Sequence, residues 1–224
     1  ANSRFRKDTW YMKKWGEPGA AGDLYYAKAH AGRRRGVPTW GDFLNRKTQG
    51  GGPVIDIGIH SLDMALWMMN NYKPKTVFAA TGNRIGKIGS NANPYGNWNT
   101  DNYSVEDFGV GLITMENGAT ILIEASWALN TTDSAEACVT LCGTKGGVCN
   151  TNETLIINGE ENGLLYDKHL ITKPNGAQFY DVADTFGPEL EMRMWIDAVI
   201  SDHDPVVLPN EMLVVSKISD AIYE

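Results

Sequence analysis

A run of strand-like segments that follows Asn71, with no helical period between them, constrains the fold of this chain more than any other feature of its sequence. The segments are KTVFAATGNR, EDFGVGLITME, ATILIEASWAL, EACVTLCGT and ETLIING, with Glu116-Asn117-Gly118 as an expected hairpin turn between the second and the third. Strands in a run, rather than strands alternating with helices, predict an α+β fold. Its centre should be an open, predominantly antiparallel sheet with helices packed on one face.

Helical periodicity marks both flanks of this run. Before it, the segment from Pro53 to Asn71 carries apolar residues at spacings of four and three, which predicts one buried face; they are Ile55, Ile59, Leu62, Leu66 and Met69. After it, we expect a helix from Glu189 to Ser201 and another beyond Pro209. Residues 1–20 should hold a short helix, and Leu24 to Ala31 a strand.

The composition narrows the class of protein. A chain of 224 residues suits a single domain, residues 1–224, with a substantial core. The net charge of −7 argues against a generic nucleic-acid binder, because phosphate contacts need clustered positive charge. Residues 1–48 nevertheless hold eleven Lys and Arg against four Asp and Glu, so we expect any anionic partner to bind there.

The sequence also bears on the cellular compartment. The longest apolar stretch, Val105 to Leu129, is interrupted by four carboxylates, and the first ten residues lack the apolar core of a signal peptide. Cys138, Cys142 and Cys149 are an odd and sparse set, so a disulfide framework is not expected, and no nearby histidine completes a zinc site. We therefore expect a cytoplasmic protein with neither a membrane partner nor a metal.

A long loop is expected between the first two segments of the strand run. Ile85 to Tyr103 is rich in Gly and Asn and too polar for a core, and loops of this length are usually functional or mobile. The chain contains neither G-x-G-x-x-G after a strand nor G-x-x-x-x-G-K-S/T, so it lacks both common phosphate cradles.

The segment GGGPVIDIGIHSLDMALW is the most informative for chemistry. On a helix, Asp56, His60 and Asp63 fall on one polar stripe, within about 60° of one another. A histidine one turn from a carboxylate can act as an oriented general acid or base. Alternatively, Asp56 only caps the first turn and His60 is a satisfied structural residue; a metal site is a third interpretation. Gly58 indicates that a ligand or another helix packs closely against the backbone.

The basic corner that begins at Arg33 is the second candidate site. Arginines bind phosphate or carboxylate with two parallel hydrogen bonds, and Lys28 precedes Arg33, Arg34 and Arg35 on the same strand. Because strand side chains alternate, the three arginines cannot all point into one cleft. Trp40 could stack on a sugar ring. The alternatives are a solvated run of charge and an aromatic residue that only packs against a turn.

The arrangement GGGPVIDIGIHSLD resembles the GGGxxxDxGxHxxD segment of the Gfo/Idh/MocA oxidoreductases. GDLYYAKAHAGRRRGVPTWG, VEDFGVGLITMENG and the closing DAVISDHDPVVLPNEMLVVSKISDAIYE extend the similarity along the chain. It covers the C-terminal domain of the family, which implies a fold like that of the dihydrodipicolinate reductase C-terminal domain. The Rossmann domain of the family, with its glycine-rich loop and its E-K-P lysine, has no counterpart here.

The resemblance implies a role for each candidate residue. His60 would take the proton of a substrate hydroxyl as hydride leaves for NAD or NADP, and Asp56 would hold the imidazole or a hydroxyl in place. Arg34, Trp40 and Lys28 would bind a sugar, inositol or similar polyol. The cofactor would be bound mainly by the N-terminal domain, so no cofactor-binding residue is assigned here. Asp63 is expected to be structural.

Two alternatives to a sugar or polyol dehydrogenase stay open. One is a non-enzymatic module for self-association or binding, and the other is an NAD-dependent glycosidase or epimerase of the same family. We expect the isolated chain to be inactive and not to bind the dinucleotide. We also expect a homo-oligomer through an apolar sheet face formed by Val110, Leu112 and Thr114 with Ile121, Ile123 and Ala125.

Overall fold

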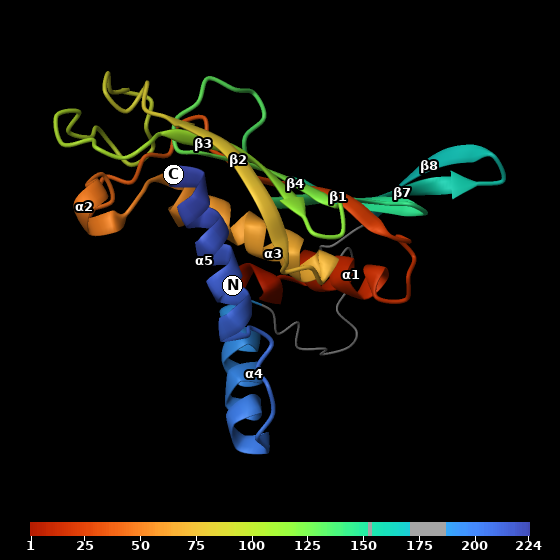
Figure 1. Cartoon of the computed structure of the whole chain (residues 1–224). Helices are drawn as coiled ribbons and strands as arrows, with labels where there is room; N and C mark the ends of the chain where they lie inside the picture. Colours follow the sequence, from red (N-terminus) through yellow and green to blue (C-terminus); the bar gives the residue numbers. More distant parts are fainter. Residues whose placement is uncertain (152–153, 171–186) are drawn as a thin grey trace, which may run out of the picture.

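The computed structural model describes residues 1–151, 154–170 and 187–224 (Figure 1). One eight-stranded sheet in the order β2-β3-β4-β1-β5-β6-β7-β8 forms its centre. The strands are β1 (Leu24–Gly32), β2 (Pro74–Gly82), β3 (Phe108–Met115), β4 (Thr120–Ser126), β5 (Ala135–Gly143), β6 (Gly146–Thr151), β7 (Thr154–Glu161) and β8 (Leu164–Leu170). The helical elements are η1 (Asn2–Phe5), α1 (Lys7–Gly16), α2 (Arg46–Gln49), η2 (Val54–Gly58), α3 (Ile59–Met69), α4 (Pro188–Ser201) and α5 (Pro209–Tyr223).

The sheet confirms the prediction of an α+β fold with a predominantly antiparallel sheet. Every neighbouring pair is antiparallel except β1 with β4, which run parallel. The first strand of the chain therefore lies in the middle of the sheet, between β4 and β5. The hairpin turn at Glu116 to Gly118 is confirmed, since Gly118 has a φ of 86° and its N–H bonds to the Met115 carbonyl. Strands β6 and β8 were not expected from the sequence.

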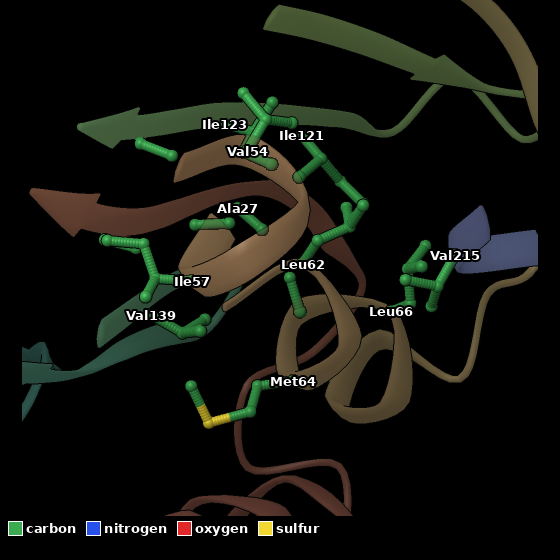
Figure 2. Close-up of a cluster of buried hydrophobic side chains, with 14 of the residues drawn as sticks. Ala27, Val54, Ile57, Leu62, Met64, Leu66, Ile121, Ile123, Val139 and Val215 are labelled. Atoms are coloured by element: carbon green, nitrogen blue, oxygen red, sulfur yellow. The ribbon is translucent and has the colours of Figure 1, made fainter. Parts of the chain in front are cut away.

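Helices α1 and α3 lie beneath the sheet, with α5 beside them, and α3 packs on the central strands (Figure 1). Alternate residues of β1 and β4 point toward α3 and are buried; they are Ala27, Ala29, Ala31, Ile121, Ile123 and Ala125. Figure 2 shows Ile121 and Ile123 beside Val54, and Leu66 beside Val215 of α5. Our expectation that the β4 residues belong to the open sheet face is therefore wrong, because they face the helix.

The opposite face of the sheet carries the other half of these strands. Phe78 is 80% exposed, and Val110 and Leu112 beside it on β3 are exposed as well. No helix of the described ranges covers this face (Figure 1). The β3 residues of the expected apolar patch are thus in place, with Phe78 of β2 as a further member.

The helix expected from Pro53 to Asn71 forms, but its first part is a π-helical turn, η2, followed by regular α3. The predicted buried face is only partly right. Leu62 and Leu66 are buried, but Ile55, Ile59 and Met69 are only half-buried. The helix is enclosed on several sides, by the sheet, α1 and α5. The wider turn also changes the angular phase of residues 54–58 relative to the residues that follow.

Glycines allow this helix to start where it does. The Glu106 carboxylate accepts hydrogen bonds from the backbone N–H groups of Gly52 and Val54, and the Tyr223 hydroxyl donates to it over 2.6 Å. A Cβ on Gly52 would lie 2.3 Å from the Glu106 carbonyl oxygen, so only glycine fits. Gly58 approaches the sheet, where its Cβ would lie 2.9 Å from that of Ala125. The close neighbour is therefore a strand, and neither a ligand nor a helix.

A buried arginine ties three distant segments together. Arg4 has no exposed surface; its Nε lies 3.1 Å from both carboxylate oxygens of Asp63, and its Nη1 lies 2.6 Å from Glu211 and 2.9 Å from the Val206 carbonyl. A buried cation needs such partners, because an unpaired one is costly. Asp63 is structural, as expected, and its partner is a guanidinium group.

The C-terminal helices form as expected, but α4 projects away from the sheet (Figure 1). Of its residues only Ala198 is buried. Among the described residues, no helix combines the length and the apolar character that a membrane crossing requires.

Candidate active site

Asp56 lies in η2 and is held by a tryptophan from the sheet. The Trp127 indole N–H donates to the Asp56 carboxylate over 2.9 Å, and Trp127, which directly follows β4, is fully buried. Burial raises the pKa of Asp56 above its ordinary value, while the Trp127 hydrogen bond and the Arg33 charge oppose that rise. The carboxylate is thus fixed in one orientation. The cap of this helix is Glu106, so Asp56 does not have the capping role considered as an alternative.

His60 lies in the first turn of α3 and is half-buried. Burial lowers its pKa below the ordinary value, against the attraction of the Asp56 and Asp63 charges. Its Nδ1 is buried without a hydrogen-bond partner among the described residues. Nε2 is not among the buried nitrogens that lack a partner. At neutral pH the imidazole is therefore neutral, and Nε2 is the nitrogen through which it can take a proton.

An ion pair lies beside these two residues. The Arg33 guanidinium binds the Glu136 carboxylate with two hydrogen bonds, and the charges of both act on Asp56. Arg33 and Glu136 line a cleft of about 540 Å³ together with Arg34 and Tyr95. Trp127, Glu136 and the role of Arg33 were not expected from the sequence. The triple arginine pointed to the region, but the partners come from strands distant in sequence.

The three arginines point to different partners, as expected, but they do not lie on the strand of Lys28, because β1 ends at Gly32. Arg35 donates to the Ser90 hydroxyl and to the Asn130 side chain, and Arg33 binds Glu136. Arg34 is exposed at the rim of the 540 Å³ cleft, where a ligand can reach it.

Trp40 and Lys28 lie in different surroundings. Trp40 is 52% exposed and packs edge-on against Tyr95 at 5.0 Å and Phe43 at 5.8 Å between ring centroids. Lys28 alternates along β1 with Ala27 and Ala29, which face α3, so its side chain lies on the opposite face of the sheet, 3.7 Å from Asp133. The structure therefore brings Asp56, His60 and the arginine corner together and leaves Lys28 away from them.

The described residues do not fit the phosphates of a dinucleotide. The glycine-rich stretch that opens a helix is Gly50 to Gly52, and the N–H groups at that helix start are already taken by Glu106. The added Cβ of Gly51 would meet the Tyr223 hydroxyl at 2.3 Å, so this space is filled too. The described residues also contain no group of three His, Cys, Asp or Glu side chains placed to hold a metal ion.

The amino-acid sequence of the chain matches a family model and a known enzyme. Residues 9–149 match the model of the GFO/IDH/MocA C-terminal domain. D-Glucoside 3-dehydrogenase of Escherichia coli (strain K12) is 37% identical over 173 residues, which are 77% of this chain and 45% of that protein. The chain thus spans less than half the length of this relative.

Solved structures share the fold at low sequence identity. Levoglucosan dehydrogenase in complex with NADH and levoglucosan has a TM-score of 0.76 at 20% identity, over 99% of this chain and 61% of that one. Aldose-aldose oxidoreductase from Caulobacter crescentus, complexed with glycerol, has a TM-score of 0.67 at 20% identity, over 99% of this chain and 59% of that one.

Proposed function

The chain belongs to the GFO/IDH/MocA oxidoreductase family, and on that premise we propose that residues 1–224 are the substrate-binding domain of a sugar or polyol dehydrogenase. The observation that carries this proposal is the pair of Asp56, fixed by Trp127, and His60, whose Nε2 is the nitrogen left open to a ligand. The sugar dehydrogenases among its relatives support the substrate class.

In the proposed reaction, a carbinol of the substrate becomes a ketone. His60 Nε2 accepts the hydroxyl proton as the C–H bond of the same carbon breaks, and a positioned base of this kind contributes about 10²–10⁴-fold to rate. Asp56 orients the imidazole or a second hydroxyl. A nicotinamide cofactor, NAD or NADP, supplies the acceptor for the hydride. Because the described residues do not fit its phosphates, we assign its binding to the remainder of the parent protein, and expect this chain alone to be inactive.

The further residues that we propose to bind substrate are exposed side chains at or near the 540 Å³ cleft. Arg34 at the cleft rim and Trp40 beyond it are the side chains that we propose to bind substrate. Lys28 is not among them in this arrangement, since its side chain lies on the other sheet face. An epimerase or an NAD-dependent glycosidase would use the same first step, so product analysis of the parent enzyme separates these from a dehydrogenase.

A second role concerns the open sheet face. Phe78, Val110 and Leu112 form an exposed apolar patch that we propose to pair with a second copy of the chain, since such patches usually mark interaction sites. A monomeric mass by light scattering, from a well-folded chain, would contradict this pairing. It would also weaken the alternative that the chain is only a self-association module. We propose a cytoplasmic location because three cysteines are an odd and sparse set, which does not suit the disulfide framework of a secreted protein.

The proposed reaction is tested in the full-length parent. His60→Asn should lower kcat by about 10²–10⁴-fold, and Asp56→Asn should lower it less if that residue only orients. Glu189→Gln, on exposed α4, is the matched control and should keep wild-type turnover. Unchanged turnover of His60→Asn across pH 6–9 would show that His60 is structural. Titration of the 224-residue chain with NADH or NADPH by calorimetry should show no binding; a micromolar Kd would overturn the assignment of the cofactor to the rest of the parent.

A further inference from the structure

The long polar loop from Ile85 to Tyr103 is held in place by side-chain hydrogen bonds, and the proposed reaction gives it no role. The Asp107 carboxylate accepts the N–H groups of Arg84, Ile85 and Gly86, and the Trp98 indole donates to the Gly86 carbonyl. Trp98 and Tyr103 are buried, which corrects the expectation that this loop is too polar to join the core. The loop is thus anchored at its start and at its end.

The middle of the loop is attached to the segment after the basic corner. The Asn93 side chain accepts the Val37 N–H and donates to the Val37 and Gly96 carbonyls, and the Thr39 hydroxyl donates to the Tyr95 carbonyl. Two segments that are separate in sequence therefore form one rigid wall.

This wall borders a second cleft, of about 610 Å³, within the range of small-molecule sites. Its lining includes Trp40, Asp42, Lys47, Asn97, Asp101 and Asn102. Among the polar side chains of this lining, amides and hydroxyls, which both donate and accept hydrogen bonds, outnumber the charged groups. Lys47 is outnumbered by the carboxylates Asp42 and Asp101, which disfavours an anionic ligand. The half-exposed Trp40 ring offers an apolar face to the C–H groups of a hydroxylated ring.

Ring contacts place the second cleft next to the candidate active site. Trp40 contacts Tyr95, which lines the cleft of Arg33 and Glu136. Trp40 also contacts Phe43, whose ring centroid lies 6.3 Å from that of Trp127, the residue that holds Asp56. The contact between Trp40 and Tyr95 thus separates the two clefts, with Tyr95 lining the first and Trp40 lining the second.

We propose that the 610 Å³ cleft is a subsite for a second, uncharged sugar ring of a glycoside, stacked on Trp40 and hydrogen-bonded by the surrounding amides. This inference rests on the proposed function for the ring that is oxidised, and it assigns the group attached to that ring. The substrate class narrows accordingly from a free sugar or polyol to a glycoside with a hydroxylated aglycone.

Binding to the 224-residue chain tests the subsite directly. Titration with cellobiose, followed by ¹H–¹⁵N NMR, should shift the Trp40 indole and Asn102 amide signals with saturation. Trp40→Ala should weaken binding about five- to tenfold. Asn102→Ala should weaken binding as well, and it provides the test if Trp40→Ala disturbs the fold. Trp195→Ala is the matched control, since Trp195 is 55% exposed and lies on α4, away from the cleft. No saturable shift, or equal binding of cyclohexanol, would overturn the subsite.

The outcome is separable from that of the proposed reaction. If the parent oxidises glucosides through His60 while cellobiose leaves the Trp40 signal unmoved, the subsite is wrong and the reaction stands. If His60→Asn keeps full turnover while cellobiose binds at Trp40, the base assignment is wrong and the subsite stands.

Discussion

Helices α3 and α4 are both rich in apolar residues, yet they meet opposite environments. Most of α3 is buried between the sheet, α1 and α5. On α4 the large apolar residues are exposed; they are Met192, Trp195, Ile196, Val199 and Ile200. Apolar content therefore predicts that a helix forms, but stability comes from what packs on it. The next four predictions test this contrast, from the largest effect to the smallest.

The largest effect is expected at the ion pair of α3. Asp63→Ala leaves the Arg4 guanidinium buried without its main carboxylate, which costs about 3–5 kcal/mol of the free energy of unfolding. Urea denaturation of the 224-residue chain measures this loss. A loss below about 1 kcal/mol would mean that water reaches Arg4.

A core truncation in the same helix should cost slightly less. Leu62 has no exposed surface, and Leu62→Ala removes buried methyl groups and leaves a cavity, at about 2–5 kcal/mol. The denaturant midpoint should fall while the m-value stays constant. A small change would show that neighbouring side chains close the cavity.

The corresponding truncation on α4 should have little effect. Ile200 is 78% exposed, so Ile200→Ala should change the free energy of unfolding by at most about 0.5 kcal/mol. The same denaturation series provides the comparison with Leu62→Ala. A loss of more than 1.5 kcal/mol would show that α4 is covered in solution.

The smallest effect concerns two histidines, His60 in the first turn of α3 and His203 just after the end of α4. Burial lowers the pKa of His60 on α3, whereas hydrogen bonds to the Asp204 carbonyl and Asp197 raise the pKa of the exposed His203 after α4. NMR titration of the Cε1 protons should show His203 titrating above His60. As pH falls below about 6.5, the unfolded chain takes up the His60 proton first, so the folded state loses stability. His60→Asn should flatten that loss; an unchanged pH dependence would contradict the buried position.

Local sequence patterns predicted the elements because periodicity is a local property. The helix that contains Asp56 and His60, the hairpin at Gly118 and most strands follow from spacing alone. Which face of a strand is buried depends on its neighbours. The alternation of Lys28 with Ala27 was visible in the sequence, but the packing of α3 on the Ala27 side of β1, which decides that Lys28 faces away from the helix, was not.

The partners that complete the site were hidden for a related reason. Trp127 reaches Asp56, and Glu106 reaches Gly52, only because the sheet brings the middle of the chain onto the start of the helix. The π-helical turn moved the phase of residues 54–58 away from the regular period on which the predicted core face depended. Long-range pairing and a local change in helical winding are both invisible to a spacing argument.

The central position of β1 has a consequence in time. During synthesis Leu24 to Gly32 leave the ribosome before any neighbour exists, because Thr120 of β4 and Cys138 of β5 are made much later. Until then the strand has two unpaired edges and an apolar face. Non-local pairing of this kind slows folding and exposes the nascent chain to aggregation. The two edges of β1 are thus both paired only after the chain has been made as far as β5.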